Sequence, residues 1–361
     1  MTLYDTTQRP GRIVVTGGCG FVGSNLAAAL AARGHPVLVF DNLSRGGSAD
    51  NASWLQRQHG DRISLQLGDI RDADAVSEAI VGAAAVLHLA GQVAVTSSVA
   101  DPVEDFTINL VGTLTVLETI RRHSPQTALL FASTNKVYGR VLEPDAVFLQ
   151  GMQYCPRRED LQDGVDEGTP LDLHSPYGCS KGAADQYVRD YARVYGLKTA
   201  VLRMSCIYGP RQYGTEDQGW IAHFILSALR SEPITIFGDG FQVRDALFID
   251  DAVDAWLRVL DKVEARPGAI YNLGGGPDNA LSLRELIGFM TTALELHPEL
   301  RRAAWRPGDQ PWYVSNIGAL GRDLGWSPRT DLVTGLHALA DWLRGQPGSA
   351  AEAPKIAEVL A

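Results

Sequence analysis

The sequence predicts an α/β protein with a doubly wound parallel sheet and a smaller C-terminal α/β lobe. Short apolar runs alternate with helical patterns as far as about residue 205. The runs are RIVVTG, PVLVFD, ISLQLGD, AVLHLAG, ALLFAS and TAVLRMS. They lack a clean alternation of apolar and polar residues, which is typical of strands buried on both faces of a parallel sheet. A chain of 361 residues is long enough to form two lobes.

The helical patterns and their ends set the predicted domain boundaries. Residues 21–34 and 105–123 have helical patterns that stop near Gly34 and Pro125. We expect a first domain over residues 11–202 with a later contribution near 241–275, a second lobe over 203–344, and a tail over 345–361. Residues 140–168 read as a polar, irregular insertion, and such a length is unusual unless it forms a lid or an interaction loop.

Charge and cysteine content exclude several classes of protein. The net charge of -10 disfavours nucleic acid or an acidic membrane as a partner, because the protein as a whole would repel phosphates. Cys19, Cys155, Cys179 and Cys206 form no CxxC pair, so the sequence predicts neither a metal site nor a disulfide framework. No apolar run approaches the length of a membrane span, and residues 1–12 lack a signal-peptide core. We therefore expect a cytoplasmic protein.

The segment TGGCGFVGSN predicts a dinucleotide-binding turn of the Rossmann type. It follows the first strand and opens the first helix, with Gly17, Gly20 and Gly23 three residues apart. Such glycines let the backbone approach a pyrophosphate, and the helix N-terminus supplies N–H groups. Asp41 ends the next strand, where a carboxylate accepts hydrogen bonds from ribose hydroxyls and repels a 2′-phosphate. The pattern therefore predicts NAD rather than NADP, although the nearby Arg45 is able to neutralise such a phosphate.

The other expected cofactor contacts follow the strand ends. Asp69, in LGDI, is a candidate acceptor for the adenine amino group or a simple turn aspartate. Gln92, after LAG, is placed over the cofactor or the sugar. Asn109 either binds through its side chain or ties a helix to a loop. The remaining candidates are Phe21, Val22, Asn42, Ser44, Arg45, Ile70, Leu89, Ala90 and Ser133.

A catalytic pair is predicted where HSPYGCSK begins a helix. Tyr177 and Lys181 are four residues apart and so lie on one helical face. Oxidation of an alcohol requires a base, and a free tyrosine, with a pKa of about 10, is too weakly acidic to serve at neutral pH. Lowering that pKa by about three units takes roughly 4 kcal/mol, which an ammonium ~4 Å away supplies at an effective dielectric of ~20. Thr134, at a strand end, would hydrogen-bond the substrate oxygen.

Taken together, these motifs resemble the extended short-chain dehydrogenase/reductase family, and within it the NAD-dependent sugar-nucleotide epimerases and dehydratases. The resemblance runs from Gly11 to about Arg344. It implies NAD in the N-terminal lobe, a nucleotide sugar in the smaller lobe, and a homodimer. It also implies Tyr177 as the base, Lys181 as its electrostatic partner, and Thr134 as the family's Ser/Thr.

The strand end STNKVYG bears on the reaction. The resembling 4,6-dehydratases have Thr-Asp-Glu where this chain has Thr134, Asn135 and Lys136. An amide does not protonate a leaving hydroxyl, and a charged lysine is a poor proton abstractor, so dehydration is disfavoured. Epimerisation needs no further acid or base, since a hydride leaves and returns to the other face of the carbon. The chain most resembles the group of CDP-paratose 2-epimerases, which implies a CDP-hexose. It departs from that group at Cys206 and in residues 140–168.

Local arginines are needed to bind an anionic substrate to an acidic protein. Arg244, in GFQVRD, and Arg306, in WRPGDQ, match the family's diphosphate-binding arginines, although either could instead pair with a neighbouring aspartate. Arg211, Gln212 and Asn135 are further candidate substrate contacts. Two alternatives on the same scaffold stay open, a 4-epimerase and a uronic-acid decarboxylase. A non-catalytic NAD sensor is a more remote one.

Overall fold

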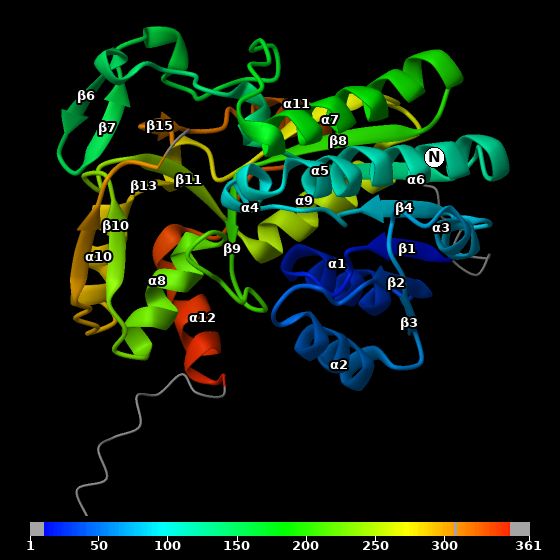
Figure 1. Ribbon diagram of the computed structural model, residues 1–361, viewed down its shortest axis with the longest axis horizontal. Coiled ribbons are helices and arrows are strands. Elements are labelled where there is room, and N and C mark those ends of the chain that lie inside the picture. Colours follow the sequence, from blue (N-terminus) through cyan, green and yellow to red (C-terminus); the bar gives the residue numbers. More distant parts are fainter. Residues whose placement is uncertain (1–10, 307–308, 347–361) are drawn as a thin grey trace, which may run out of the picture.

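The computed structural model describes residues 11–306 and 309–346, and a seven-stranded parallel sheet lies at its centre (Figure 1). In spatial order the strands are β3 (Ile63–Leu67), β2 (Val37–Asp41), β1 (Ile13–Thr16), β4 (Ala85–His88), β5 (Ala128–Thr134), β8 (Thr199–Met204) and β12 (Ala269–Leu273). The order reverses between β1 and β4, which is where a doubly wound sheet opens a crevice for ligands. The fold class predicted from the sequence is confirmed.

Helices cover both faces of this sheet, which explains the apolar strands. Val14 on β1 and Val86 on β4 pack into one core, whereas Val15 and Leu87, their chain neighbours, pack into the other. The helices α1 (Phe21–Ala32), α2 (Ser48–His59) and α9 (Ile249–Lys262) lie on one side. On the other side lie α3 (Ala73–Ile80), α6 (Gly112–His123) and α7 (Ser175–Tyr195). Alternate residues of each strand therefore face opposite hydrophobic cores.

The C-terminal half of the chain builds smaller sheets. The strand β11 (Val243–Phe248) pairs with β9 (Cys206–Tyr208), β13 (Ala280–Ser282) and β15 (Trp312–Tyr313), and β10 (Ile234–Phe237) pairs with β14 (Leu300–Ala303). The helices here are α8 (Trp220–Leu229), α10 (Leu283–Thr292), α11 (Gly318–Leu324) and α12 (Leu332–Arg344). Between β11 and β13 the chain returns to the central sheet, because β12 pairs with β8. The proposed division into lobes stays a prediction, and residues 347–361 of the expected tail lie outside the described residues.

Short helices complete the region around the site. They are α4 (Val95–Ala100), α5 (Pro102–Phe106), the π-helix η1 (Thr107–Val111), and the 3₁₀ helices η2 (Asn135–Tyr138), η3 (Pro144–Ala146), η4 (Glu159–Leu161) and η5 (Pro277–Asn279). Among the described residues no helix is both long and apolar enough to cross a membrane.

The segment 140–168 is not irregular throughout, as the sequence pattern indicated. It contains an antiparallel hairpin of β6 (Val147–Gln150) and β7 (Gln153–Pro156). The Tyr154 hydroxyl donates to Asp239 at 2.5 Å, and the Gln153 amide donates to Glu285 at 2.7 Å. These partners lie far away in the sequence, so the local pattern did not reveal that the hairpin packs against the C-terminal half.

The buried imidazole of His88, at the end of β4, should make the folded protein less stable in acid. Its nitrogens lie 2.7 Å from the Thr16 hydroxyl and 3.1 Å from that of Thr113, and burial lowers the pKa of His88 to about 3. Between that value and the unfolded pKa of about 6.5, only the unfolded state binds the proton, so this contribution to stability is lost as the pH falls.

Below pH 6.5 the unfolding free energy of the parent should fall more steeply with decreasing pH than that of His88→Gln. The difference between the two slopes should reach up to about 1.4 kcal/mol per pH unit, because the variant lacks the titrating group. Urea unfolding of both proteins between pH 7 and pH 4 measures it. Parallel pH profiles would show that His88 does not carry this effect.

Candidate active site

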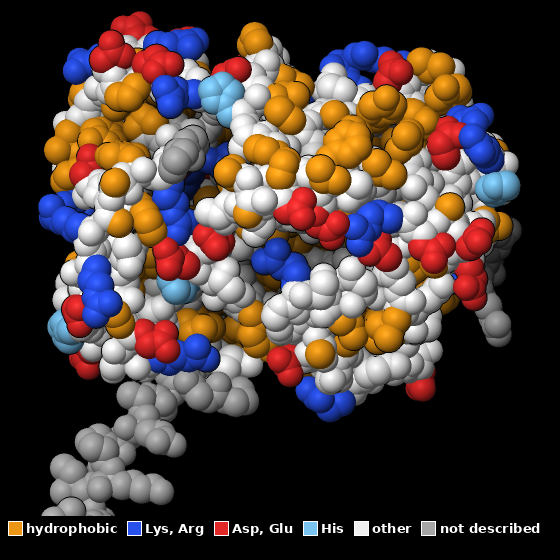
Figure 2. Space-filling model, in the orientation of Figure 1, with side chains coloured by type: hydrophobic (Ala, Val, Ile, Leu, Met, Phe, Trp, Pro, Cys, Tyr) orange, Lys and Arg blue, Asp and Glu red, His pale blue; other side chains and the backbone are white. Residues whose placement is uncertain are grey.

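A cavity of about 340 Å³ opens at the carboxyl ends of the central strands. Its walls come from the loops after β1, β2, β3 and β4, from the end of β5, and from the first turns of α7. Figure 2 shows the molecule hollowed near the middle of this face, with basic side chains visible inside. Parallel α/β sheets bind their ligands at this edge, so the topology and the cavity indicate the same place.

The glycine turn after β1 lines the cavity, and two of its glycines are required by close packing of the backbone. Gly17 has φ +66°, and a Cβ there would lie 2.6 Å from the Ala90 nitrogen. A Cβ on Gly23 would lie 2.2 Å from the Gly17 carbonyl oxygen. Gly20 caps α1, whose first N–H groups have no side-chain acceptor at the cap. The turn therefore fits a pyrophosphate that accepts hydrogen bonds from the helix N-terminus.

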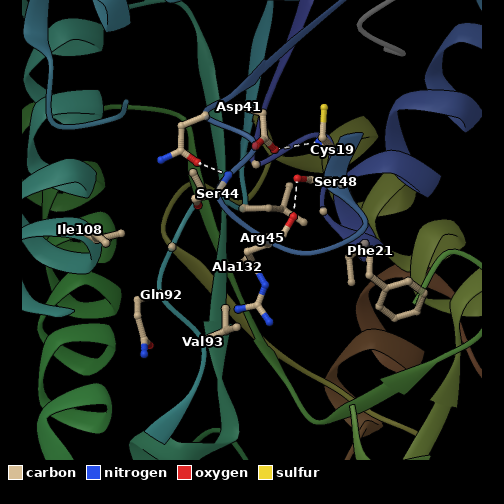
Figure 3. Close-up of a pocket in the computed structure, with 18 of the residues that line it drawn as sticks. Cys19, Phe21, Asp41, Ser44, Arg45, Ser48, Gln92, Val93, Ile108 and Ala132 are labelled. Atoms are coloured by element: carbon tan, nitrogen blue, oxygen red, sulfur yellow. Dashed lines mark hydrogen bonds between the residues drawn. The ribbon is translucent and has the colours of Figure 1, made fainter. Parts of the chain in front are cut away.

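Asp41 is fixed by the backbone around it. One carboxylate oxygen accepts the N–H of Cys19 at 2.9 Å, and the other accepts that of Leu43 at 2.8 Å. Each oxygen keeps a further lone pair for a hydroxyl donor, so the geometry fits a ribose (Figure 3). Cys19 was not predicted as part of the site, because its contribution is a backbone N–H.

Asp69 lines the cavity but is already paired. Its two oxygens accept hydrogen bonds from Arg71 at 2.9 and 2.7 Å, and this pairing lowers the pKa of the Asp69 carboxyl. If Asp69 also bound an adenine amino group, its oxygens would accept hydrogen bonds from both that group and the Arg71 guanidinium.

Arg45 extends from the loop after β2 into the cavity (Figure 3). Burial lowers the pKa of the guanidinium, while its charge acts to lower the pKa of Tyr177. The sequence placed Arg45 near a ribose phosphate, and the structure brings it instead within electrostatic reach of the predicted catalytic end.

Tyr177 and Lys181 lie side by side on α7 and both line the cavity, but the electrostatics differ from the prediction. Burial raises the pKa of Tyr177 to about 12, although a hydrogen bond with Thr134 and the charge of Arg45 act to lower it. Burial also lowers the pKa of Lys181 to about 7, against the attraction of Asp185 and Asp105. The expected depression of the Tyr177 pKa is therefore wrong for the protein groups alone, because desolvation outweighs the nearby charges.

The Lys181 ammonium is positioned by the strand beneath it. It donates to the Ala132 carbonyl oxygen at 2.5 Å and lies 4.2 Å from the centre of the Phe131 ring. Both partners belong to β5, so the lysine ties the catalytic helix to the central sheet.

Asn109 sits in η1 and connects this helix to the loop after β4. Its oxygen accepts the Gln92 N–H at 2.9 Å, and its nitrogen donates to Asp105 and Ser180 at 3.0 and 3.1 Å. It is absent from the cavity wall, so the structure shows the tie between helix and loop. Its direct contact with a cofactor stays a prediction.

A buried ion pair lies below the catalytic helix, and the sequence patterns did not reveal it. Arg203 on β8 donates to both oxygens of Asp185 on α7, at 2.9 and 3.0 Å. The side chains are 2% and 0% exposed. Ser133 donates to the same carboxylate at 2.7 Å. The Ser133 hydroxyl therefore supports α7, and the residue also borders the cavity.

The two predicted diphosphate arginines lie outside the cavity wall, and both are paired. Arg244 donates to Asp309 at 2.7 Å, and Arg306 donates to Glu216 at 2.7 Å. The Arg306 guanidinium also lies 3.8 Å from the centre of the Phe237 ring. The alternative weighed for these residues was pairing with the neighbouring aspartates Asp245 and Asp309, and of these only Asp309 is a partner, for Arg244. The role of both arginines in substrate binding stays a prediction.

The other substrate candidates divide between the cavity and its neighbourhood. Arg211 and Gln212 line it, and the Arg211 guanidinium lies 4.1 Å from the Trp54 ring centre. Asn135 is buried next to Thr134, with its oxygen 3.4 Å from the Thr134 hydroxyl.

Most predicted cofactor residues meet in one place. Those that line the cavity are Gly17, Gly20, Phe21, Val22, Asp41, Asn42, Ser44, Arg45, Asp69, Ile70, Leu89, Ala90, Gln92, Ser133, Tyr177 and Lys181. Lining residues that the sequence reasoning did not single out as site residues include Cys19, Ser48, Asn51, Ile108, Ala132, Met204 and Tyr213. Within residues 11–306 and 309–346, no group of His, Cys, Asp and Glu side chains is arranged to hold a metal ion.

Comparison with known proteins identifies the family. The model of the NAD dependent epimerase/dehydratase family matches residues 13–274. The chain belongs to this family. It is 40% identical to CDP-paratose 2-epimerase of Salmonella typhi over 338 residues, which cover 92% of this chain and 98% of the relative. It is 33% identical to dTDP-glucose 4,6-dehydratase of Mycolicibacterium smegmatis, covering 92% and 93%.

Solved structures agree with this assignment. UDP-glucose 4-epimerase of Thermus thermophilus in complex with NAD aligns with a TM-score of 0.78 at 33% identity, over 92% of this chain and 99% of that one. The dTDP-glucose 4,6-dehydratase DesIV of Streptomyces venezuelae, with NAD and TYD bound, has a TM-score of 0.80 at 29% identity, over 94% and 98%. The protein is thus an NAD-dependent enzyme of this family, and the glycine turn and Asp41 fit that cofactor.

The close packing at Gly23 predicts that the cofactor turn does not tolerate a side chain at this position. Gly23→Ala forces a Cβ against the Gly17 carbonyl, so we expect roughly a tenfold or greater loss of NAD affinity. Isothermal titration with NAD measures it. Gly288→Ala on α10 is the matched control, because its Cβ would meet nothing within 4 Å. Equal NAD affinity of the Gly23 variant and the parent would contradict the assignment of this turn.

Proposed function

We propose that the protein is an epimerase that inverts C2 of a CDP-activated hexose, with CDP-paratose as the leading substrate. The observation that carries the proposal is the end of β5, where Asn135 and Lys136 occupy the places of the acid and base that dehydratases use. The 40% identity to a CDP-paratose 2-epimerase over 92% of the chain supports the nucleotide and the carbon.

Bound NAD supplies a hydride acceptor with a positively charged nicotinamide ring. Tyr177 takes the proton of the sugar hydroxyl, and Thr134, hydrogen-bonded to that phenol, steadies the oxygen as negative charge develops on it. After the resulting ketone has presented its other face, Tyr177 returns the proton to the oxygen. Lys181 holds its place between α7 and β5 throughout, through the Ala132 carbonyl.

Proton transfer by Tyr177 requires more positive charge than its neighbours provide. Its pKa is about 12 in the protein, with Arg45 and Thr134 already acting to lower it. A cation next to a buried phenol favours the ionised form. The base therefore gains its strength only when the positive ring is in place, which confines proton abstraction to the loaded enzyme.

Three other functions are weaker candidates. A 4-epimerase has the same machinery, and relatives include the putative UDP-glucose 4-epimerase of Methanocaldococcus jannaschii at 32% identity. A uronic-acid decarboxylase uses the same scaffold, but no observation on this chain favours it. A non-catalytic NAD sensor would not need Tyr177 and Lys181, yet both line the cavity.

Product analysis tests the proposal. The NAD-loaded enzyme is incubated with CDP-paratose, CDP-glucose and UDP-glucose in deuterated water, and the products are identified by NMR. We expect inversion at C2 of CDP-paratose with no deuterium at that carbon, because the same hydride leaves and returns. Inversion at C4, or deuterium at the inverted carbon, would overturn the proposed reaction.

The tyrosine variant separates catalysis from binding. Tyr177→Phe should lower kcat by at least about 100-fold while the enzyme still binds NAD, because only the proton-transfer group is removed. Tyr271→Phe on β12, at a position outside the cavity wall, is the control and should keep full activity. Full activity of the Tyr177 variant would show that another group is the base.

We propose a homodimer formed through the helices that lie over the catalytic side of the sheet. Their exposed apolar residues are Val99, Val103, Phe106, Val111, Tyr187, Val194 and Tyr195. Figure 2 shows hydrophobic side chains gathered over this region of the molecule. Large exposed apolar patches mark interaction surfaces.

Charge placed in this patch should dissociate the dimer. We expect Val103→Glu, at a position 70% exposed, to shift the protein from dimer to monomer in sedimentation experiments. Val333→Glu on α12, at a position 55% exposed, is the control that should leave the assembly unchanged. A parent protein that sediments as a monomer would refute the dimer.

A further inference from the structure

Lys136 places a cation next to the catalytic strand end. It follows Thr134 by two residues in η2, and its backbone N–H donates to the Thr134 hydroxyl at 3.2 Å. Its ammonium donates to the side-chain oxygen of Gln310 at 3.3 Å. Gln310 is a neutral partner, so the hydrogen bond orients the ammonium without cancelling its charge.

Lys136 and the charged groups around it together carry more positive than negative charge. Arg244 on β11 and Asp309 both act on the ammonium, and these two side chains pair with each other at 2.7 Å. The arginine and the aspartate balance, which leaves the lysine as the excess cation of the cluster. Cys206 on β9 is the remaining titratable neighbour, and burial raises the pKa of its thiol, so it supplies no negative charge at neutral pH.

Asp245, on the same strand as Arg244, has other hydrogen-bond partners and is not among the charges that act on the Lys136 ammonium. Its oxygens accept hydrogen bonds from Ser205 at 2.5 Å and from the Gly276 N–H at 3.3 Å, in a fully buried position. Burial raises the pKa of its carboxyl. A desolvated ammonium whose only nearby carboxylate is already paired with an arginine costs stability, and Lys136 carries this cost, since burial lowers its pKa to about 8. An anionic ligand would remove it.

The chemistry of the proposed substrate identifies the anion. In a sugar nucleotide, C1 carries the terminal phosphate through one oxygen, and C2 is bonded directly to C1. A sugar that presents C2 to Thr134 and Tyr177 therefore brings its phosphate close to the end of β5. A sugar that presents C4 places the phosphate across the ring, away from this strand end. A cation two residues beyond Thr134 suits the first geometry.

We propose that the Lys136 ammonium binds the phosphate attached to C1 of the sugar and thereby holds C2 at Thr134 and Tyr177. Gln310 orients the ammonium, and Arg244 binds the same diphosphate from β11. The assignment of the carbon rests on the proposed function, whereas the contact between Lys136 and a phosphate stands on the charge cluster.

Nucleotide binding to the NAD-loaded enzyme tests the contact. CDP has the phosphate that Lys136 would bind, and CMP lacks it, so the comparison isolates one phosphate. We expect Lys136→Met to weaken CDP binding roughly 10- to 100-fold in isothermal titration and to leave CMP binding unchanged. UDP and UMP serve as a second pair, so that a wrong nucleobase is recognised separately.

Two further variants test whether the effect depends on the charge at position 136 and on its place in the fold. Lys136→Arg keeps the charge and should retain most of the preference for CDP over CMP. Lys262→Met removes a lysine at the end of α9 and should change neither affinity. Bound NAD and the thermal midpoint confirm that each variant is folded. If Lys136→Met is not folded, the parent enzyme still decides, because its preference for CDP should fall as the pH rises from 7 to 9.

Unchanged discrimination between CDP and CMP in folded Lys136→Met, or a preference independent of pH, would overturn the proposal. These outcomes are independent of the reaction. If the parent enzyme inverts C4 but the lysine variant loses CDP, the proposed function fails and the phosphate contact survives. If it inverts C2 but the variant binds CDP normally, the contact fails alone.

Discussion

The ion pair between Asp185 and Arg203 is the interaction on which the position of the active site depends. It joins α7, which carries the catalytic tyrosine and lysine, to β8 of the central sheet at 2.9 and 3.0 Å. Ser133 on β5 donates to the same carboxylate, and Tyr138 accepts from the guanidinium at 3.0 Å. A buried ion pair is tolerated only when such hydrogen bonds satisfy it. Because loss of either partner would leave a buried charge, the helix and the strand end hold one fixed arrangement.

The ion pair fixes the position of the site, but the protein groups of the site do not supply enough positive charge to ionise Tyr177. Burial favours the neutral forms of both Tyr177 and Lys181, with pKa values of about 12 and 7. Arg45 acts on the phenol from a loop rather than from the sheet. The fixed framework therefore supplies geometry, while part of the charge that would activate the proposed base comes from a loop arginine and from the bound cofactor. Such a division keeps a reactive phenolate from forming before the cofactor is present.

The sequence predicted the sheet and most of the cofactor site because both depend on local patterns. Apolar runs mark strands, and ligands gather where parallel strands end, so Gly17, Asp41 and Tyr177 were expected to meet. The sequence did not reveal contacts between distant segments. The hairpin at residues 147–156, the pairing of Asp185 with Arg203 and the choice of Glu216 as the partner of Arg306 each depend on tertiary packing. For the protein groups alone, the pKa of Tyr177 is shifted upward rather than downward, because burial is a property of the fold that the sequence pattern does not reveal.

The end of β5 shows how one scaffold supports different reactions. Thr134, the proposed contact of the reacting oxygen, is held by the strand and by its hydrogen bond from the Lys136 N–H in η2. The two residues that follow then decide which further step is possible. A carboxylic acid and a carboxylate there permit elimination, whereas an amide in the place of the acid does not protonate a leaving group and a charged lysine in the place of the base is a poor proton abstractor. An ammonium in that place does favour an anion beside the reacting carbon. A sugar nucleotide places an anion beside its reacting carbon when that carbon is C2, because C2 is bonded to C1, the carbon that bears the phosphate.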